Sequence, residues 1–197
     1  MQYIISEGIF MKTEKQIYQI KVVLAGSKPS IWRRILVSSD ISLVKLHDVL
    51  QIAIGWEDCH LHQFKYQGKF YLIPNEEFDV GFDREDLNEK KFKLNQLLKT
   101  VKDSMVYEYD FGDGWEHKIT LEKILPFENK EKLPRCISGK MSCPPEDCGG
   151  IWGYYNLLDA IQDEDHPEHD SMLEWLGEGF DPEYFDMDEI NSVLARI

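Results

Sequence analysis

The chain has 197 residues, of which 43% are hydrophobic and 12% aromatic, and this composition excludes a disordered or collagen-like protein. The net charge is −14, and residues 136–197 hold 15 acidic but only 2 basic side chains. This field opposes non-specific binding to nucleic acid and favours a protein partner at the acidic C-terminal surface. No apolar run approaches the roughly 20 residues of a membrane-spanning helix, so we expect no membrane partner.

Residues 1–10 contain one glutamate and no Lys or Arg, so they lack the basic start of a secretory signal. We therefore expect a cytoplasmic protein with reduced cysteines. The predicted organisation is an N-terminal extension over 1–16, followed by one domain over 17–197.

The first predicted elements are two strands and a helix. Apolar side chains alternate over 18–24 and again over 31–37, which is typical of strands. Apolar positions then follow helical spacing over 43–53. Ser42 is a suitable N-cap for this helix, and Gly55 stands where a helix ends.

A hairpin is predicted next, with strands over 64–66 and 69–73. Residues 74–91 are charged and poor in aliphatic side chains, which predicts a surface excursion with little role in the core. Leucines at 94, 97 and 98 then indicate a short helix.

A second hairpin is predicted around the Gly-Asp-Gly sequence at 112–114, and two registers are open. A two-residue turn places Asp110 opposite His117, as an acid–base pair would require. A three-residue loop with Gly114 in the left-handed conformation pairs Tyr109 with His117 and gathers the aromatic side chains on one face. We favour the loop because it separates apolar from charged faces, and it makes His117 a hydrogen-bonded core residue.

The rest of the chain is predicted to be a long irregular loop over 127–148 and then helices. The helices are expected at 151–162, after Pro167, and from 187 to 196 behind an Asp186 cap. Since strands come first and no βαβ alternation is visible, the predicted fold class is α+β. We expect an antiparallel-rich sheet or roll with N-terminal strands and hairpins, packed by helices concentrated in the C-terminal third.

Two further groups of residues suggest binding chemistry. Cys136, Cys143 and Cys148 supply three soft ligands within thirteen residues, so zinc is a possible cofactor, with the fourth ligand open among His117, His60, His62 and Cys59. Trp32, Arg33 and Arg34 suggest local nucleic-acid binding, by stacking and phosphate contact. Neighbouring arginines on a strand point to opposite faces, so only one of them joins the tryptophan.

Taken in order, several segments resemble the plasmid pRiA4b ORF-like family. They are SIWRRI at 30–35, LHDVL at 46–50, GW at 55–56, HLHQF at 60–64, YEYDFGDGWEH at 107–117, PPEDCGG at 144–150 and FDPE at 180–183. The resemblance implies an α+β roll without an established activity. Some members are labelled transposon resolvases, and others are fused to a repressor-type DNA-binding domain. The family's motif positions imply a candidate cleft formed by Arg33, Asp110, Asp113, Trp115, His117, Glu146, Asp147 and Gly149.

Three functions follow as hypotheses. The leading one is a non-catalytic binding or interaction module of a family associated with mobile elements. The alternative is a metal-assisted hydrolase that uses Asp110, Asp113, His117 and the cysteine loop around a divalent cation. The second alternative is local nucleic-acid binding through residues 32–34.

Overall fold

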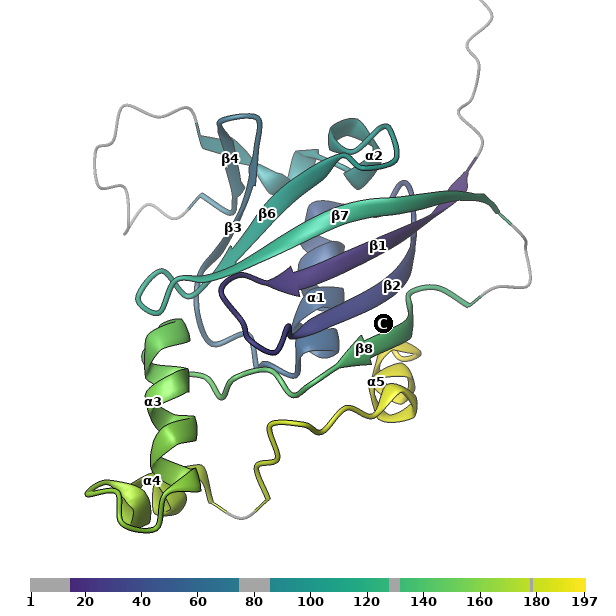
Figure 1. The fold of residues 1–197 in the computed structure, drawn as a ribbon. Helices are drawn as coiled ribbons and strands as arrows, with labels where there is room; N and C mark the ends of the chain where they lie inside the picture. Colours follow the sequence, from purple (N-terminus) through teal and green to yellow (C-terminus); the bar gives the residue numbers. More distant parts are fainter. Residues whose placement is uncertain (1–14, 75–85, 128–131, 178) are drawn as a thin grey trace, which may run out of the picture.

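The computed structural model describes residues 15–74, 86–127, 132–177 and 179–197. Within them one sheet of eight strands runs in the order β5-β4-β3-β6-β7-β1-β2-β8, and its pairs are antiparallel except β4 with β5 (Figure 1). The strands are β1 Gln16–Leu24, β2 Trp32–Ser38, β3 His62–Tyr66, β4 Lys69–Leu72, β5 Asp86–Asn88, β6 Ser104–Tyr109, β7 Trp115–Pro126 and β8 Arg135–Lys140. The helices are α1 Leu43–Ile54, α2 Leu94–Leu97, α3 Gly150–Gln162, α4 His169–Leu176 and α5 Met187–Leu194. The predicted α+β class is confirmed.

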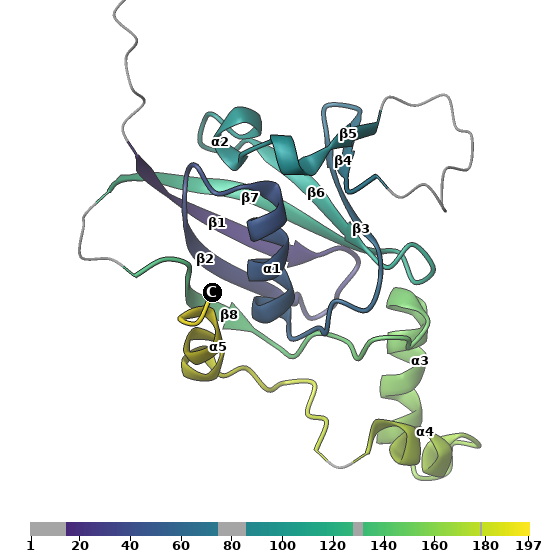
Figure 2. The same ribbon diagram turned by 180° about the vertical axis from the view of Figure 1, so that it is seen from behind.

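Helix α1 lies across one face of the sheet and fills the core (Figure 2). Its apolar stripe is fully buried, and both predicted ends are confirmed. The Ser42 side chain accepts a hydrogen bond from the Lys45 N–H, and Gly55 ends the helix with a left-handed φ of 97°. None of the described helices is long and apolar enough to cross a membrane.

The sheet has one apolar and one polar face. Buried side chains alternate along β6 and along the first half of β7, and the intervening side chains are more exposed. On the polar face Lys65 forms ion pairs of 2.9 Å with Glu108 and 2.8 Å with Glu116. An antiparallel sheet that is covered on one side has this pattern.

The register of the β6–β7 hairpin differs from the prediction by two residues. Tyr109 pairs with Trp115 and Tyr107 with His117. The pairing of His117 with Asp110 and its pairing with Tyr109, one for each predicted register, are therefore both wrong. The loop is longer because Asp110 leaves the strand with φ 55°, and its carbonyl accepts a 2.6 Å hydrogen bond from the Gly114 N–H. Since a shift by two residues keeps every side chain on its face, the predicted aromatic face and the left-handed Gly114 are confirmed.

Strand β8 occupies part of the segment 127–148, which was wrongly predicted as irregular loop throughout. It pairs with β2, and α5 packs beside it. The Asn191 side chain accepts a 2.8 Å hydrogen bond from the Cys136 N–H and donates another, also 2.8 Å, to the Cys136 carbonyl. Because these partners are distant in sequence, local pattern does not reveal the strand.

Residues 74–91 were predicted to form a surface excursion with little role in the core, and this prediction is wrong for 86–91. Residues 75–85 lie outside the described residues. Residues 86–88 form β5, and a 3₁₀ helix follows at Glu89–Lys91. Glu89 is 0% exposed, and its carboxylate lies 3.1 Å from the His62 ring nitrogen Nε2. The contact with His62 therefore allows the Glu89 side chain to lie in the core.

Helices α3 and α4 lie beyond one end of the sheet, and the chain then returns to α5 beside β8 (Figures 1 and 2). Helix α4 begins at His169, two residues later than the Pro167 start predicted from sequence. Helix α5 begins after Asp186, whose carboxylate accepts hydrogen bonds from the N–H groups of Asp188 and Glu189, as predicted. The predicted extension 1–16 lies outside the described residues up to residue 14, and Gln16 already belongs to β1.

Candidate functional site

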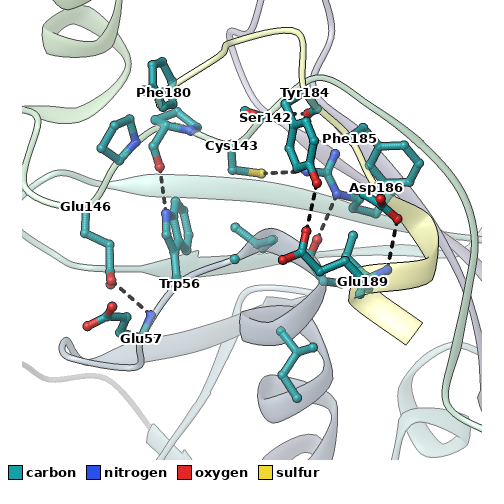
Figure 3. Close-up of a pocket in the computed structure, with 18 of the residues that line it drawn as sticks. Trp56, Glu57, Ser142, Cys143, Glu146, Phe180, Tyr184, Phe185, Asp186 and Glu189 are labelled. Carbon is teal, nitrogen blue, oxygen red and sulfur yellow. Dashed lines mark hydrogen bonds between the residues drawn. The ribbon is translucent and has the colours of Figure 1, made fainter. Parts of the chain in front are cut away.

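A cavity of about 740 Å³ lies between the end of α1, the loop after β8 and the C-terminal segment (Figure 3). Its apolar walls include Trp56, Phe180 and Phe185. The Trp56 indole N–H donates a 2.9 Å hydrogen bond to the Pro144 carbonyl, which holds the 141–147 loop against the end of α1. The cavity is thus built by three segments that are far apart in the sequence.

Arg33 lines this cavity and is 4% exposed. Its guanidinium donates to the carbonyls of Ala53 at 2.8 Å, Trp32 at 3.0 Å and Lys140 at 3.1 Å. The ring of Phe185 lies 4.9 Å from the guanidinium carbon. A cation at the C-terminal end of α1 is favourable because unpaired carbonyls gather there. The arginine therefore ties β2, α1, β8 and the C-terminal segment together.

Five carboxylates line the cavity, and all except that of Glu146 are exposed at its mouth. They belong to Glu57, Glu146, Asp147, Asp186 and Glu189. Glu146 accepts hydrogen bonds from the Glu57 N–H at 3.0 Å and the Tyr109 hydroxyl at 2.5 Å. Burial, and then this hydrogen bond, raise the pKa of Tyr109, so it stays a neutral donor. Among the described residues that line the cavity, Arg33 is the one basic side chain.

Two aromatic side chains of the cavity remain open to solvent. Trp175 of α4 is 50% exposed, and Tyr184 is 53% exposed although its hydroxyl donates to Glu189 at 3.0 Å (Figure 3). Large apolar side chains left at the rim of a concave surface are typical of a binding site. No local pattern in the sequence marks these residues, because they come together only when α4 and the segment before α5 fold toward α1.

Asp110 and Asp147 of the predicted cleft meet at His60. The His60 Nε2 atom lies 3.2 Å from Asp147 Oδ1 and 3.9 Å from Asp110 Oδ2. The three side chains come from the segment before β3, the β6–β7 loop and the loop before α3. The sequence suggested His60 as a possible fourth ligand of the cysteine site, and the family motif at 60–64 contains it.

Asp113 and Gly149 join the β6–β7 loop to α3. The Asp113 carboxylate accepts a 3.0 Å hydrogen bond from the Gly149 N–H, directly before the helix. Gly150 has φ 68°, and a Cβ atom there would lie 2.4 Å from the Asp113 carbonyl oxygen. These motif residues therefore form a close packing contact, which the turn chemistry alone did not reveal.

Trp115 and His117 lie in the core rather than in an open cleft. Neither ring nitrogen of His117 has a hydrogen-bond partner of good geometry among the described residues. Burial lowers the pKa of His117 to about 3, although the nearby Trp115 backbone opposes the shift. The imidazole is therefore neutral, and the predicted partners Asp110 and Asp113 are engaged elsewhere.

The three cysteines have separate surroundings. Cys136 is buried and donates to the Ser138 carbonyl, while Cys143 lies 3.7 Å from an Arg33 nitrogen and lines the cavity. Burial raises the pKa of all three thiols, that of Cys148 to about 12. Within the described part of the chain, no group of three possible ligand atoms includes any of them.

The arginines of the predicted nucleic-acid site point to opposite faces, as expected for a strand. Arg34 donates to both carboxylate oxygens of Glu122, at 2.6 and 2.9 Å, and lies 5.1 Å from the Trp32 ring centre. Arg33 is buried on the other face. The structure therefore leaves Trp32 with an arginine whose charge is already paired.

A buried polar network beside α1 was missed from the sequence. The rings of His47 and His62 stack with centres 3.5 Å apart. His47 contacts the Tyr107 hydroxyl and Asp58, each at 2.8 Å, and burial lowers the pKa of His47. The sequence does contain a sign of this network. His47 follows the apolar Leu43 by one helical turn, so its side chain is expected to face the core.

Comparisons with known proteins agree with the motifs. Residues 16–189 match the family model described as plasmid pRiA4b ORF-3-like protein. An uncharacterised protein, y4hQ of Sinorhizobium fredii (strain NBRC 101917 / NGR234), is 37% identical over 162 residues, which are 82% of this chain and 81% of that protein. The crystal structure of a protein of unknown function, MM3350 from Methanosarcina mazei Go1, is 37% identical. It superposes with a TM-score of 0.78 over 90% of this chain and 98% of the other.

Proposed function

The chain belongs to the plasmid pRiA4b ORF-3-like family. Because y4hQ and MM3350 are described without a function, we propose one from the cavity of this protein. The protein is a non-catalytic interaction module whose cavity takes a basic, amphipathic segment of a partner protein. The observation that carries this proposal is an aromatic cavity with half-exposed Trp175 and Tyr184 beside a mouth rich in carboxylates.

Charge complementarity supports a basic occupant. Five carboxylates line the cavity, and its one described basic side chain, Arg33, is directed to backbone carbonyls of the protein itself. The Arg33 donors are therefore used within the protein, and five carboxylates against one guanidinium leave the cavity negatively charged. Complementary potentials of this kind guide encounter and discriminate against acidic partners.

The apolar walls support an amphipathic occupant rather than a simple cation. A helix with one apolar face commonly binds by laying that face into a groove, with aromatic anchors supplying most of the binding energy. Trp56 and Phe180 supply such walls, and Trp175 stands at the entrance. Lysines that flank the apolar face of the partner segment would then meet Glu57 and Asp147, both of which are exposed.

The polar groups of the cavity support binding rather than turnover. The Glu146 carboxylate is held by two donors, and burial raises the pKa of the Cys143 thiol. A thiol with a raised pKa is a poor nucleophile at neutral pH.

The test uses two fluorescein-labelled synthetic peptides, one an amphipathic helix of Lys, Leu and Trp and the other the same sequence with Glu in place of Lys. Fluorescence anisotropy should show binding of the basic peptide only, weakening as salt is added. Trp175→Ala should weaken binding by at least about tenfold. Trp152→Ala is the matched control, because Trp152 is 80% exposed on α3 and lies outside the cavity lining. This variant should bind the basic peptide as tightly as the wild type does.

Equal affinity for the two peptides, or equal losses in Trp152→Ala and Trp175→Ala, would overturn the cavity as the binding site. Turnover of a small-molecule or nucleic-acid substrate by the purified protein, abolished in Asp110→Asn, would overturn the non-catalytic assignment.

A further inference from the structure

We propose that His60, Asp110 and Asp147 form a binding site for a divalent transition-metal cation, with Mn²⁺, Fe²⁺ and Zn²⁺ as the fitting class. This site goes beyond the interaction cavity, because it needs no ligand in the cavity. It also differs from the cysteine site and from the Asp110–Asp113–His117 set that the sequence suggested.

The distances suit a metal ion. One ligand atom from each of the three side chains lies within 4.8 Å of the others, and His60 Nε2 is 3.2 Å from Asp147 Oδ1. Ligand atoms bound at about 2.0–2.2 Å from one ion lie roughly 3–4 Å apart in tetrahedral or octahedral arrangements. Closing the site therefore requires only small side-chain movements.

Unpartnered polar atoms point into the site. His60 Nε2 is buried and has no hydrogen-bond partner of good geometry among the described residues. Asp110 is 8% exposed, and within the described parts of the chain only its Oδ1 atom accepts a hydrogen bond, at 2.9 Å from the Gly112 N–H. Its other oxygen, Oδ2, faces His60 at 3.9 Å. Leaving such groups unpaired is costly, and a cation bound between them would remove that cost.

The backbone holds these side chains in place. Asp110 has φ 55° and Asp147 φ 60°, both in the left-handed region that non-glycine residues seldom adopt. The Asp110 N–H donates to the Leu61 carbonyl at 2.9 Å, and the His60 N–H donates to the Tyr109 hydroxyl at 3.2 Å. The segment before β3 and the β6–β7 loop are thereby locked together, as a pre-formed ligand set requires.

Two neighbouring groups are less suited to an ion. The stacked rings of His47 and His62 are 5° from parallel, so their nitrogen lone pairs do not converge, and both rings already bind protein groups. In the group of Glu57, Cys59 and Glu146, the pKa of the Cys59 thiol is raised and Glu146 is hydrogen-bonded. One imidazole with two carboxylates, as at His60, offers the nitrogen and oxygen donors that Mn²⁺, Fe²⁺ and Zn²⁺ accept.

The test measures Mn²⁺ binding, because Mn²⁺ prefers oxygen and imidazole ligands to thiolates. The electron paramagnetic resonance signal of free Mn²⁺ should fall until one ion is bound per chain. Pulsed measurements on the bound ion should show coupling to a ¹⁴N nucleus. His60→Gln should remove that coupling and weaken binding by at least about tenfold, and Asp110→Asn and Asp147→Asn should weaken binding to a similar extent.

Two control variants separate this site from others. His166→Gln removes an imidazole that lies outside every candidate group of the described residues, and Cys59→Ser disrupts the neighbouring cluster, so both should bind Mn²⁺ as the wild type does. Absence of stoichiometric binding, binding unchanged in His60→Gln and Asp110→Asn, or binding abolished by Cys59→Ser would each overturn the site. Circular dichroism of each variant shows whether a loss reflects unfolding. Peptide binding by His60→Gln and Asp110→Asn, whose residues do not line the cavity, keeps this test separate from the proposed function.

Discussion

Arg33 and Arg34 are adjacent in sequence but lie in different environments. The Arg33 guanidinium is buried and donates to three carbonyls, whereas the Arg34–Glu122 ion pair keeps about a quarter of each side chain exposed, 28% and 24%. A buried carbonyl that loses its donor costs about 1–3 kcal/mol, while a surface ion pair contributes about 1 kcal/mol or less. The strand's alternation of faces thus assigns the two arginines different roles.

We therefore predict that Arg33→Met lowers the free energy of unfolding by roughly 3 kcal/mol, because it leaves the Ala53 and Lys140 carbonyls without their donor. Arg34→Met is the matched control and should cost about 1 kcal/mol or less. Urea unfolding of both variants measures the difference. Equal losses would contradict an anchoring role for Arg33.

His117 should make the protein sensitive to acid. Burial holds the pKa of His117 at about 3 in the folded state, below the value of 6.5 expected in the unfolded chain. Above pH 6.5 neither state binds this proton, so stability does not depend on it. Between pH 6.5 and about 3 the unfolded chain binds the proton and the folded protein does not, so stability falls by about 1.4 kcal/mol per unit of decreasing pH.

We predict that His117→Phe, which keeps a ring in the same space, loses this part of the pH dependence. Urea unfolding from neutral pH to about pH 4.5 should give a smaller slope for the variant than for the wild type. The lowered pKa of His47 contributes a similar slope to both proteins, so the comparison isolates His117. Identical slopes would show that the His117 imidazole becomes protonated within the fold.

Among the elements, the β6–β7 loop and the start of α3 depend on close backbone approach. Gly150 and Gly114 have nearly equal φ values, 68° and 67°. A Cβ at Gly150 would lie 2.4 Å from the Asp113 carbonyl oxygen, whereas a Cβ at Gly114 meets nothing within 4 Å. Both glycines therefore adopt a left-handed backbone, but a side chain would clash with a neighbouring loop at Gly150 and not at Gly114.

We predict that Gly114→Ala costs about 1–2 kcal/mol from its left-handed backbone and that Gly150→Ala costs clearly more, because the loop must also move away from α3. Chemical unfolding measures both losses, and hydrogen exchange of the α3 amides shows whether the helix loosens only in Gly150→Ala. Similar losses, with α3 equally protected in both variants, would contradict the packing contact.

For the whole molecule, charge is distributed very unevenly. The net charge is −14, and 15 of the 36 acidic residues lie in 136–197, where only 2 basic residues compensate them. Self-repulsion of this kind destabilises a compact state and is screened by salt. We predict that the melting temperature rises with KCl concentration while binding of the basic peptide weakens. A melting temperature that falls with salt would show that ion pairs such as Arg34–Glu122 outweigh the repulsion.

Local signals in the sequence determined most elements and their ends. Alternating apolar residues predict β1 and β2, and helical spacing with Ser42 and Gly55 predicts α1 together with both of its ends. Such signals succeed because a cap or a face depends on residues a few positions apart. The family resemblance rests on the same kind of information, since each motif is a short run of the chain.

Tertiary structure alone decided the hairpin register, strand β8, the cavity and the His60 group. A shift of two residues leaves every side chain on its face, so hydrophobic pattern cannot distinguish the favoured three-residue-loop register of the β6–β7 hairpin from the observed one. Strand β8 pairs with β2 and is hydrogen-bonded to Asn191, which lies 55 positions away from Cys136. His60, Asp110 and Asp147 meet because three loops pack together, and contacts at such separations follow from the packing of the whole chain and leave no local trace in the sequence.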